Sequence, residues 1–180
     1  MRRVFIGSEA LAGGGLTRAA LRWNYRRLFP DVYVPAGAIP SLRDRTLGAW
    51  LWSGRNGVIA GRAAAALHGA RWVDQQTPIE MIFRCGRPPP GIIVRNERLD
   101  DDEVTQVGGL LVTTVQRTAF DLARHRPRNE AVADLDAFAQ ATGVKAVDVL
   151  ALAERYPGAR GTRRATTALG LMDAGAQSPR

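Results

Sequence analysis

The chain has 180 residues, 46% of them hydrophobic, and a formal net charge of +8. This length is enough to bury a core in one large domain or two small ones. No apolar run would span a bilayer, and Ser8 and Glu9 interrupt the apolar start, which argues against a secretory signal. The single cysteine, Cys85, excludes an internal disulfide and a zinc site built from several cysteines. We therefore expect a cytoplasmic globular protein.

The positive charge is concentrated in the first third of the chain. Residues 1–62 contain ten arginines and three acidic residues, a net charge of +7, whereas residues 63–180 carry only +1. A GC-rich genome would favour arginine over lysine, but it would not explain this asymmetry. Polyanion binding does explain it, because cationic side chains that neutralise phosphates release counterions. The charge pattern therefore predicts nucleic-acid binding by the N-terminal part.

A short first helix is predicted over residues 4–12, with Ser8 as its N-cap. Gly13–Gly15 follows as a turn into a second helix. A glycine run can also cradle phosphates, but a nucleotide-binding loop needs a following Gly-Lys-Ser/Thr sequence, which is missing here. The turn is therefore the better interpretation.

The second helix is predicted over Arg18–Tyr25, because Thr17 is a good N-cap and the residues after it have helical spacing. On this helix we expect Leu21 to face inward. We expect Arg18 and Arg22 to face outward, where they would be available to a ligand.

The periodicity changes to alternation after this helix. Arg27–Phe29 and Val32–Val34 are predicted as strands, and Pro30-Asp31 between them is a turn pair. A short basic helix followed by a small basic hairpin is typical of a winged helix-turn-helix, in which the helix enters the major groove and the hairpin lies along the DNA backbone. Four arginines in so short a segment would pack poorly but suit phosphates. We therefore predict that residues 1–38 form a DNA-binding domain.

Residues 39–172 are predicted to form a second, α+β domain. After a linker at Pro35–Pro40, the segment Ser41–Trp52 has the pattern of an amphipathic helix. Its inward positions are Leu42, Leu47, Trp50 and Leu51. On the same helix, Arg43 and Arg45 either add DNA-backbone contacts or form a solvated face.

A short buried strand is predicted over residues 57–60, followed by an alanine-rich helix, Gly61–His68, that ends at Gly69. To act as a base or metal ligand, His68 would need a second histidine, cysteine or carboxylate nearby, and the pattern supplies none. A histidine in the last turn of a helix can instead bond the free carbonyls there. We expect this structural role.

The middle of the chain is predicted to form a small mixed or antiparallel sheet, and we expect antiparallel pairing. Pro78–Arg84 and Gly91–Glu97 alternate as strands and are joined by a rigid loop, Gly86–Pro90. A second hairpin has strands at residues 104–107 and 110–112 and turns at the two glycines between them.

Two charged groups in this region have a structural and a functional interpretation. Asp100–Glu103 could hold a divalent ion, but four successive carboxylates point in different directions, and we expect a solvated turn. On a predicted helix, Thr113–Arg124, the residues Arg117 and Asp121 lie one turn apart. Arg117 could bind a phosphate or a partner carboxylate, but an ion pair within the helix is the simpler explanation.

Three further helices are predicted, over Asn129–Ala141, Val144–Tyr156 and Ala159–Met172. Arg160, Arg163 and Arg164 share one basic face of the last helix, which is either solvated or extends a nucleic-acid surface. Residues 173–180 have no core-forming pattern and are expected to be a disordered tail.

The residue pattern gives no indication of catalysis. Cys85 lies in a strand with no histidine close in sequence, and nothing supports a spatial pairing with His68 or His125. We predict a protein that is not an enzyme and that has no catalytic residues, cofactor or metal.

Four stretches of the chain together resemble one family. They are LTRAALRWNYRRLFPDVYVPAG, AGRAAAALHGARW, GGLLVTTVQRTAFDLAR and RYPGARGTRRATTALGLMDAGAQSP. This combination resembles actinobacterial proteins related to the AbiEi antitoxin of type IV toxin–antitoxin systems, over essentially the whole chain. The motifs are apolar and small-residue patterns, so they identify the fold better than the activity.

The resemblance implies an N-terminal winged helix that binds repeats in the promoter of its own operon. It also implies a C-terminal α/β domain associated with antitoxicity against a nucleotidyltransferase toxin, with direct contact left open. The DNA contacts that it implies are the basic positions of the matching N-terminal motif: Arg18, Arg22, Arg26 and Arg27.

Many longer relatives continue past the equivalent of GAQSP into a Vsr-like endonuclease domain. No Asp…Glu-X-Lys constellation occurs here, since the only lysine is Lys145, and nuclease activity is therefore expected to be absent. The expected function is a DNA-binding transcriptional autorepressor that acts as an antitoxin. The alternatives are the DNA-targeting part of a truncated Vsr-like endonuclease-type protein and an interaction module without specific DNA binding.

Overall fold

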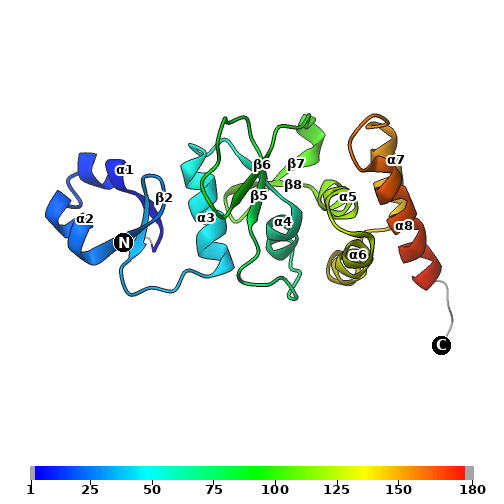
Figure 1. The fold of residues 1–180 in the computed structure, drawn as a ribbon, viewed down its shortest axis with the longest axis horizontal. Helices are drawn as coiled ribbons and strands as arrows, with labels where there is room; N and C mark the ends of the chain where they lie inside the picture. Colours follow the sequence, from blue (N-terminus) through cyan, green and yellow to red (C-terminus); the bar gives the residue numbers. More distant parts are fainter. Residues whose placement is uncertain (1–2, 177–180) are drawn as a thin grey trace.

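The computed structural model describes the backbone of residues 3–176 and the side chains of residues 3–171. The molecule is elongated, with a small N-terminal unit at one end, a sheet at the centre and a group of helices at the other end (Figure 1). This arrangement of helices and sheets confirms the predicted α+β class. None of the helices described is long and apolar enough to cross a membrane.

The N-terminal unit combines two short helices with a three-stranded sheet. Its elements are β1 (Phe5–Ile6), α1 (Gly7–Ala12), α2 (Arg18–Asn24), β2 (Tyr25–Phe29) and β3 (Val32–Pro35). The strands are antiparallel in the order β1-β3-β2. Thr17 caps α2 as predicted, because its hydroxyl oxygen accepts the N–H of Ala20 at 3.1 Å. The predicted second helix and the hairpin are confirmed.

The predicted helix over residues 4–12 is wrong at its beginning. Phe5 and Ile6 form β1, which pairs with β3, and the helix begins only at Gly7 with Ile6 at the N-cap position. Ser8 is therefore not the cap, and its hydroxyl and N–H groups donate to the carboxylate of Asp31 instead. Strand pairing outweighs the local helical preference here, because tertiary context decides the conformation of so short a segment.

The three-stranded sheet is covered on both faces (Figure 1). Towards α1, the rings of Phe5 and Tyr33 stack with centroids 6.2 Å apart. On the opposite face, Phe29 packs against helix α3 (Leu42–Trp52), where a Cβ added at Gly48 would lie 3.2 Å from the ring. Because successive side chains of a strand alternate between faces, β2 and β3 contribute side chains both to the face towards α1 and to the face towards α3.

Helix α3 connects the N-terminal unit to the rest of the molecule. It begins with a capping box, in which Ser41 and Asp44 each bond the backbone N–H of the other. The predicted inward positions are buried or half-buried: Leu42, Leu47, Trp50 and Leu51. Because α3 packs against all three N-terminal strands and against the central sheet, the two units share one continuous hydrophobic core.

The central sheet is mixed, with strand order β6-β5-β4-β8-β7. Its strands are β4 (Val58–Ala60), β5 (Ile79–Ile82), β6 (Ile92–Arg95), β7 (Val104–Val107) and β8 (Leu110–Thr113). β4 is antiparallel to β5 and parallel to β8, and β7 is antiparallel to β8. The hairpin of β7 and β8 turns at Gly108-Gly109 as predicted, with φ angles of 58° and 81°.

The expectation of antiparallel pairing is wrong for β5 and β6, which are parallel. The loop between them, residues 83–91, contains Pro88–Pro90. Proline favours extended backbone, so this short loop can run back along the sheet without a crossover helix. β6 therefore begins beside the start of β5, where the N–H of Ile79 donates to the carbonyl of Gly91 at 2.9 Å.

The remaining elements are helical. They are α4 (Gly61–Leu67), the short 3-10 helix η1 (Asp101–Glu103), α5 (Val115–His125), α6 (Arg128–Thr142), α7 (Ala146–Glu154) and α8 (Thr162–Ala176). α5 packs against α4, α6, α7 and α8 and is the central helix of this end of the molecule.

Two predicted helix boundaries need correction. α6 begins at Arg128, one residue before the predicted start at Asn129, with Pro127 at the N-cap position, and it ends at Gly143, which is in the left-handed conformation. α8 continues to Ala176, so the first residues of the expected tail are helical. Residues 177–180 of that tail lie outside the described residues.

Candidate nucleic-acid interface

Helix α2 presents a basic, aromatic surface to solvent. Its one buried residue is Leu21. Arg22 and Trp23 lie about 100° and 200° around the helix from Leu21, at the 3.6 residues per turn of an α-helix, and therefore point away from the core. Trp23 is 76% exposed, and the guanidinium of Arg22 lies 5.9 Å from the centroid of its ring. Trp23 lies within the predicted helix, but the helical spacing alone does not indicate that its side chain is exposed.

The hairpin places the two neighbouring arginines of β2 on opposite faces. Arg27 pairs with Tyr33, on the face towards α1, whereas Arg26 pairs with Val34, which is buried on the other face. The Nη2 atom of Arg26 donates to the carbonyl of Ala38 at 3.0 Å and so ties β2 to the following linker.

The four predicted DNA-binding arginines are therefore not equivalent. Arg18, Arg22 and Arg27 are exposed, and their side chains make no hydrogen bond or ion pair to any residue between 3 and 171. Arg26 is also exposed, but it is held by the backbone on the side of the linker. Arg18 and Arg22 lie one turn apart on α2. Arg27 lies on the same side of the sheet as α1, because it pairs with Tyr33, whose ring lies against Gly7.

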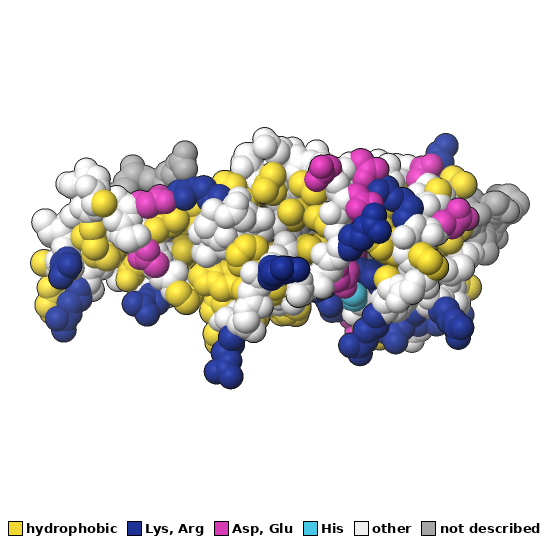
Figure 2. Space-filling view, turned by 90° about the horizontal axis from the view of Figure 1, so that it is seen from above, with side chains coloured by type: hydrophobic (Ala, Val, Ile, Leu, Met, Phe, Trp, Pro, Cys, Tyr) yellow, Lys and Arg dark blue, Asp and Glu magenta, His cyan; other side chains and the backbone are white. Residues whose placement is uncertain are grey.

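Both acidic groups of this unit are already occupied. Glu9 accepts two hydrogen bonds of 2.7 Å from Arg55, which lower the pKa of its carboxyl group. Asp31 accepts from Ser8. Neither carboxylate is paired with Arg18, Arg22 or Arg27, and Figure 2 shows basic side chains at this end of the molecule.

The other arginines considered for DNA contact, on α3, have different environments. Arg45 donates to the backbone carbonyls of Gln75 and Thr77, the latter at 2.8 Å, and so anchors a loop of the central part. Burial lowers the pKa of its guanidinium. Arg43 is exposed and lies beside the β7–β8 turn, away from α2.

The larger unit contains a buried network of charges on α5. Arg117 is 1% exposed, and its guanidinium donates to Asp121 at 3.1 Å and to Glu103 at 2.5 Å. The predicted pair of Arg117 and Asp121 is confirmed, but it is buried and extends to Glu97 and Arg124. Because its donors are taken by these carboxylates, Arg117 is not available to a phosphate.

Comparison with known protein families matches residues 57–173 to the AbiEi antitoxin C-terminal domain. The match covers more than half of the chain and includes the central sheet and the helices after it. The chain belongs to the AbiEi antitoxin family. It has the role of an antitoxin in a toxin–antitoxin system, as a regulator with a partner toxin. No curated protein matches the chain.

The acidic run of the AbiEi domain is not the solvated turn that its sequence suggests. Glu103 is buried, bonded by Arg117 and by the hydroxyl of Tyr156. Burial and the hydrogen bond to Glu103 raise the pKa of Tyr156 to about 12. Asp100 and Asp102 bind the guanidinium of Arg155 at 2.6 and 2.8 Å. The run therefore fastens the loop before β7 to the end of α7.

Two groups of carboxylate and histidine side chains in the AbiEi domain lie close enough to share a metal ion. They are Glu97, Asp121 and His125, and Asp100, Asp102 and Glu103. In each group an arginine already binds the carboxylates, Arg124 in the first and Arg155 in the second. These guanidinium groups occupy the positions that a cation would take.

The histidine of α4 has a structural role, but not the predicted one. Nε2 of His68 lies 2.8 Å from the carbonyl oxygen of Thr113, at the end of β8, rather than bonding carbonyls of its own helix. Its ring also meets that of Phe138 at 6.1 Å. His68 therefore fastens α4 to the sheet and to α6 in the AbiEi domain.

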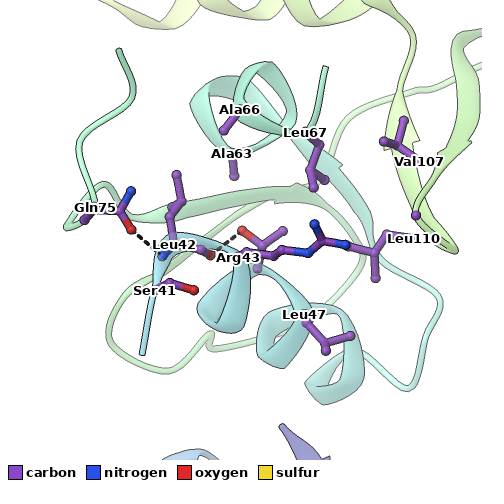
Figure 3. Close-up of a pocket in the computed structure, with 12 residues that line it drawn as sticks. Ser41, Leu42, Arg43, Leu47, Ala63, Ala66, Leu67, Gln75, Val107 and Leu110 are labelled. Carbon is purple, nitrogen blue, oxygen red and sulfur yellow. Dashed lines mark hydrogen bonds between the residues drawn. The ribbon is translucent and has the colours of Figure 1, made fainter. Parts of the chain in front are cut away.

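A groove of about 350 Å³ lies where α3 meets the AbiEi domain (Figure 3). Its walls are mainly apolar side chains of α3, α4 and the β7–β8 hairpin: Leu42, Leu47, Ala63, Ala66, Leu67, Val107 and Leu110. Arg43 extends across it towards Leu110, and the N–H of Leu42 donates to Gln75 at 2.8 Å. The polar side chains that line it are Ser41, Arg43, Thr46 and Gln75, and they include no reactive pair.

Proposed function

We propose that this AbiEi-family antitoxin is a DNA-binding autorepressor of its own promoter. Residues 1–38 would form the winged helix-turn-helix that reads DNA, and residues 39–172 the antitoxin domain. The observation that carries the proposal is the order of elements in the N-terminal unit. A strand, two helices separated by a glycine turn, and a hairpin whose second strand pairs with the first strand suit a winged helix.

In this proposal α2 lies in the major groove and the β2–β3 hairpin lies along the backbone. Arg18 and Arg22 contact phosphates at the edges of the groove, and Arg27 contacts a phosphate from the hairpin. Arg26 adds to the positive field while it holds the linker through Ala38. Trp23, exposed beside Arg22, supplies an apolar contact such as the methyl group of thymine accepts.

The partners are double-stranded DNA of the promoter and a nucleotidyltransferase toxin, and the site of action is the cytoplasm. No cofactor or metal takes part, and the protein is not a nuclease. Direct contact with the toxin is a separate question from antitoxicity.

Two cellular measurements test the proposal. A reporter driven by the upstream region of the gene should be repressed by the wild-type protein and released by Arg18→Ala plus Arg22→Ala. Co-expression with the neighbouring toxin gene should restore growth. Growth rescue without repression would favour the interaction module, and DNA binding without growth rescue would favour a DNA-targeting protein of another system.

A further inference from the structure

A second polar site lies at the opposite end of the molecule from α2. A hollow of about 460 Å³ is bounded by the end of β6, the last turn of α5 and the start of α8. The basic side chains in its walls are Arg95, Arg124, His125, Arg160 and Arg164. Figure 2 shows basic side chains gathered over this helical end as well. The volume is that of a small-molecule site rather than of a single ion.

The floor of the hollow contains a buried donor. Arg124 is 3% exposed, and its Nη2 atom donates to Glu97 and, at 2.9 Å, to Asp121. Its buried Nε atom has no hydrogen-bond partner in the part of the chain that is described. A buried N–H without an acceptor is unfavourable, which leaves this guanidinium with donor capacity that the protein itself does not use.

The carboxylates beside the hollow are already neutralised. Glu97 is shared by Arg117, Arg124 and His125, whose Nε2 atom lies 3.3 Å from Oε1. Burial acts to raise the pKa of Glu97, but the hydrogen bonds from His125 and Arg124 outweigh it and lower the pKa to about 2. Arg95 is paired in the same way with the buried Glu80. The remaining charge of the walls is therefore positive.

That charge belongs to Arg160 and Arg164 at the start of α8. Both are exposed, and neither side chain forms a hydrogen bond or ion pair with the residues whose side chains are described. Gly161 between them has φ +87°, and a Cβ there would lie 2.7 Å from the carbonyl oxygen of Arg124. A glycine at this position thus lets the start of a fifteen-residue helix, with its partial positive charge, approach the buried arginine.

We propose that this hollow binds the phosphate groups of a small phosphorylated ligand of nucleotide size. Arg160 and Arg164 donate to the phosphate oxygens from the rim, and Arg124 donates from the floor. Guanidinium groups approaching from different elements suit a phosphate, because its oxygens accept hydrogen bonds from several directions and each guanidinium can donate two. The site is independent of the proposed DNA interface and of the proposed repressor function.

Calorimetry tests the proposal. The full chain is titrated with pyrophosphate and, separately, with adenosine diphosphate at constant ionic strength. The wild type should bind at least one of them saturably with one site per chain. Arg160→Ala plus Arg164→Ala should weaken binding about tenfold or more. The control, Arg43→Ala plus Arg71→Ala, removes the same charge from exposed positions outside the hollow and should bind as the wild type does. Tighter binding of the nucleotide would identify a nucleoside phosphate, and equal binding a free diphosphate.

Two results would overturn the proposal. One is the lack of saturable binding of either probe to the wild type, and the other is an equal loss of affinity in both double variants, which would reveal only a general effect of charge. Circular dichroism establishes that each variant is folded. Arg160→Lys plus Arg164→Lys, which keeps the charge, should recover part of the affinity, and the backbone amide of Gly161 in the wild type should shift in the NMR spectrum on titration.

Discussion

Arg26 and Arg27 are neighbours in sequence but face different sides of the N-terminal sheet. Alternation along β2 places Arg27 beside Tyr33 and turns Arg26 towards the linker, where it bonds Ala38. Both are exposed. The sequence does not predict the register with β3, which decides the face that each one occupies. We therefore expect Arg27 to contribute more to DNA binding than Arg26.

Replacing Arg22 and Arg27 together with alanine should weaken DNA binding about tenfold or more. Each lost phosphate contact removes about 0.9 from the slope of log K against log salt concentration, so the slope should become less steep by about 2. Arg26→Ala alone should change the affinity less than Arg27→Ala alone. An unchanged salt slope in the double variant, measured beside Arg43→Ala plus Arg71→Ala, would place the DNA surface elsewhere.

The buried guanidinium of Arg117 makes a different prediction. Arg117→Met leaves Glu103 and Asp121 buried without their main cation, which should lower the free energy of unfolding by about 3–5 kcal/mol. Arg155→Met removes a more exposed partner of the acidic run and should lower the free energy of unfolding much less. Urea unfolding measures both. Equal and small shifts would show that the α5 network contributes little to stability.

The low pKa of Glu97 links this network to pH. Its folded-state value of about 2 lies below the usual value of 4.5, so its contribution to stability is complete above pH 4.5 and is lost as the pH falls towards 2. At pH 7, Glu97→Gln should destabilise the protein by on the order of 1–2 kcal/mol, after allowance for solvent screening of a half-exposed group. The difference from the wild type should disappear near pH 2. A difference that stays constant with pH would contradict this account.

The elements that the sequence predicts well are those determined locally. The Thr17 cap fixes the start of α2, the two glycines fix the turn between β7 and β8, and the pattern of α3 identifies its buried side. β1 and the parallel pairing of β5 with β6 depend instead on contacts between distant segments. β1 has only two residues, and the loop between β5 and β6 contains no helix. Neither segment has a sequence pattern that would indicate which strand it pairs with or in which direction.

The two sides of helix α2 have opposite environments, one buried and one exposed, and a pair of substitutions tests this. Leu21→Asp buries an unpaired charge and should unfold the N-terminal unit. Trp23→Asp introduces the same residue on the same helix at a position that is 76% exposed, and this variant should stay folded. Thermal melts followed by circular dichroism and by one-dimensional NMR compare them. A folded Leu21→Asp variant would mean that α2 does not pack as described.

In the whole molecule, the two ends are joined by one core and by ion pairs across the joint. Arg3 pairs with Asp44 and Arg55 with Glu9, and α3 packs against both sheets. The buried network around Arg117 spans residues more than fifty positions apart, through Tyr156 and Arg155. Because these residues are so far apart in sequence, the sequence predicts only an ion pair within one helix and a separate solvated turn. In the structure, both belong to one connected network.

The same arrangement bears on function, because it separates the basic N-terminal end from the AbiEi domain. The family match identifies the antitoxin, whereas the order of strands and the free arginines of the N-terminal unit support the repressor. If both proposals hold, variants at the N-terminal end should lose repression and keep antitoxicity. This outcome would be seen only if the two units act independently.

The central claim is that the N-terminal unit recognises the promoter of its own gene. Fluorescence anisotropy measures this recognition most directly. Labelled DNA from the upstream region is compared with an unrelated duplex of the same length, each at several salt concentrations. We predict tight, sequence-selective binding whose affinity falls as salt rises, with Arg18, Arg22 and Arg27 accounting for much of the salt dependence. Weak binding that is equal on both duplexes would contradict the claim and leave only a basic surface.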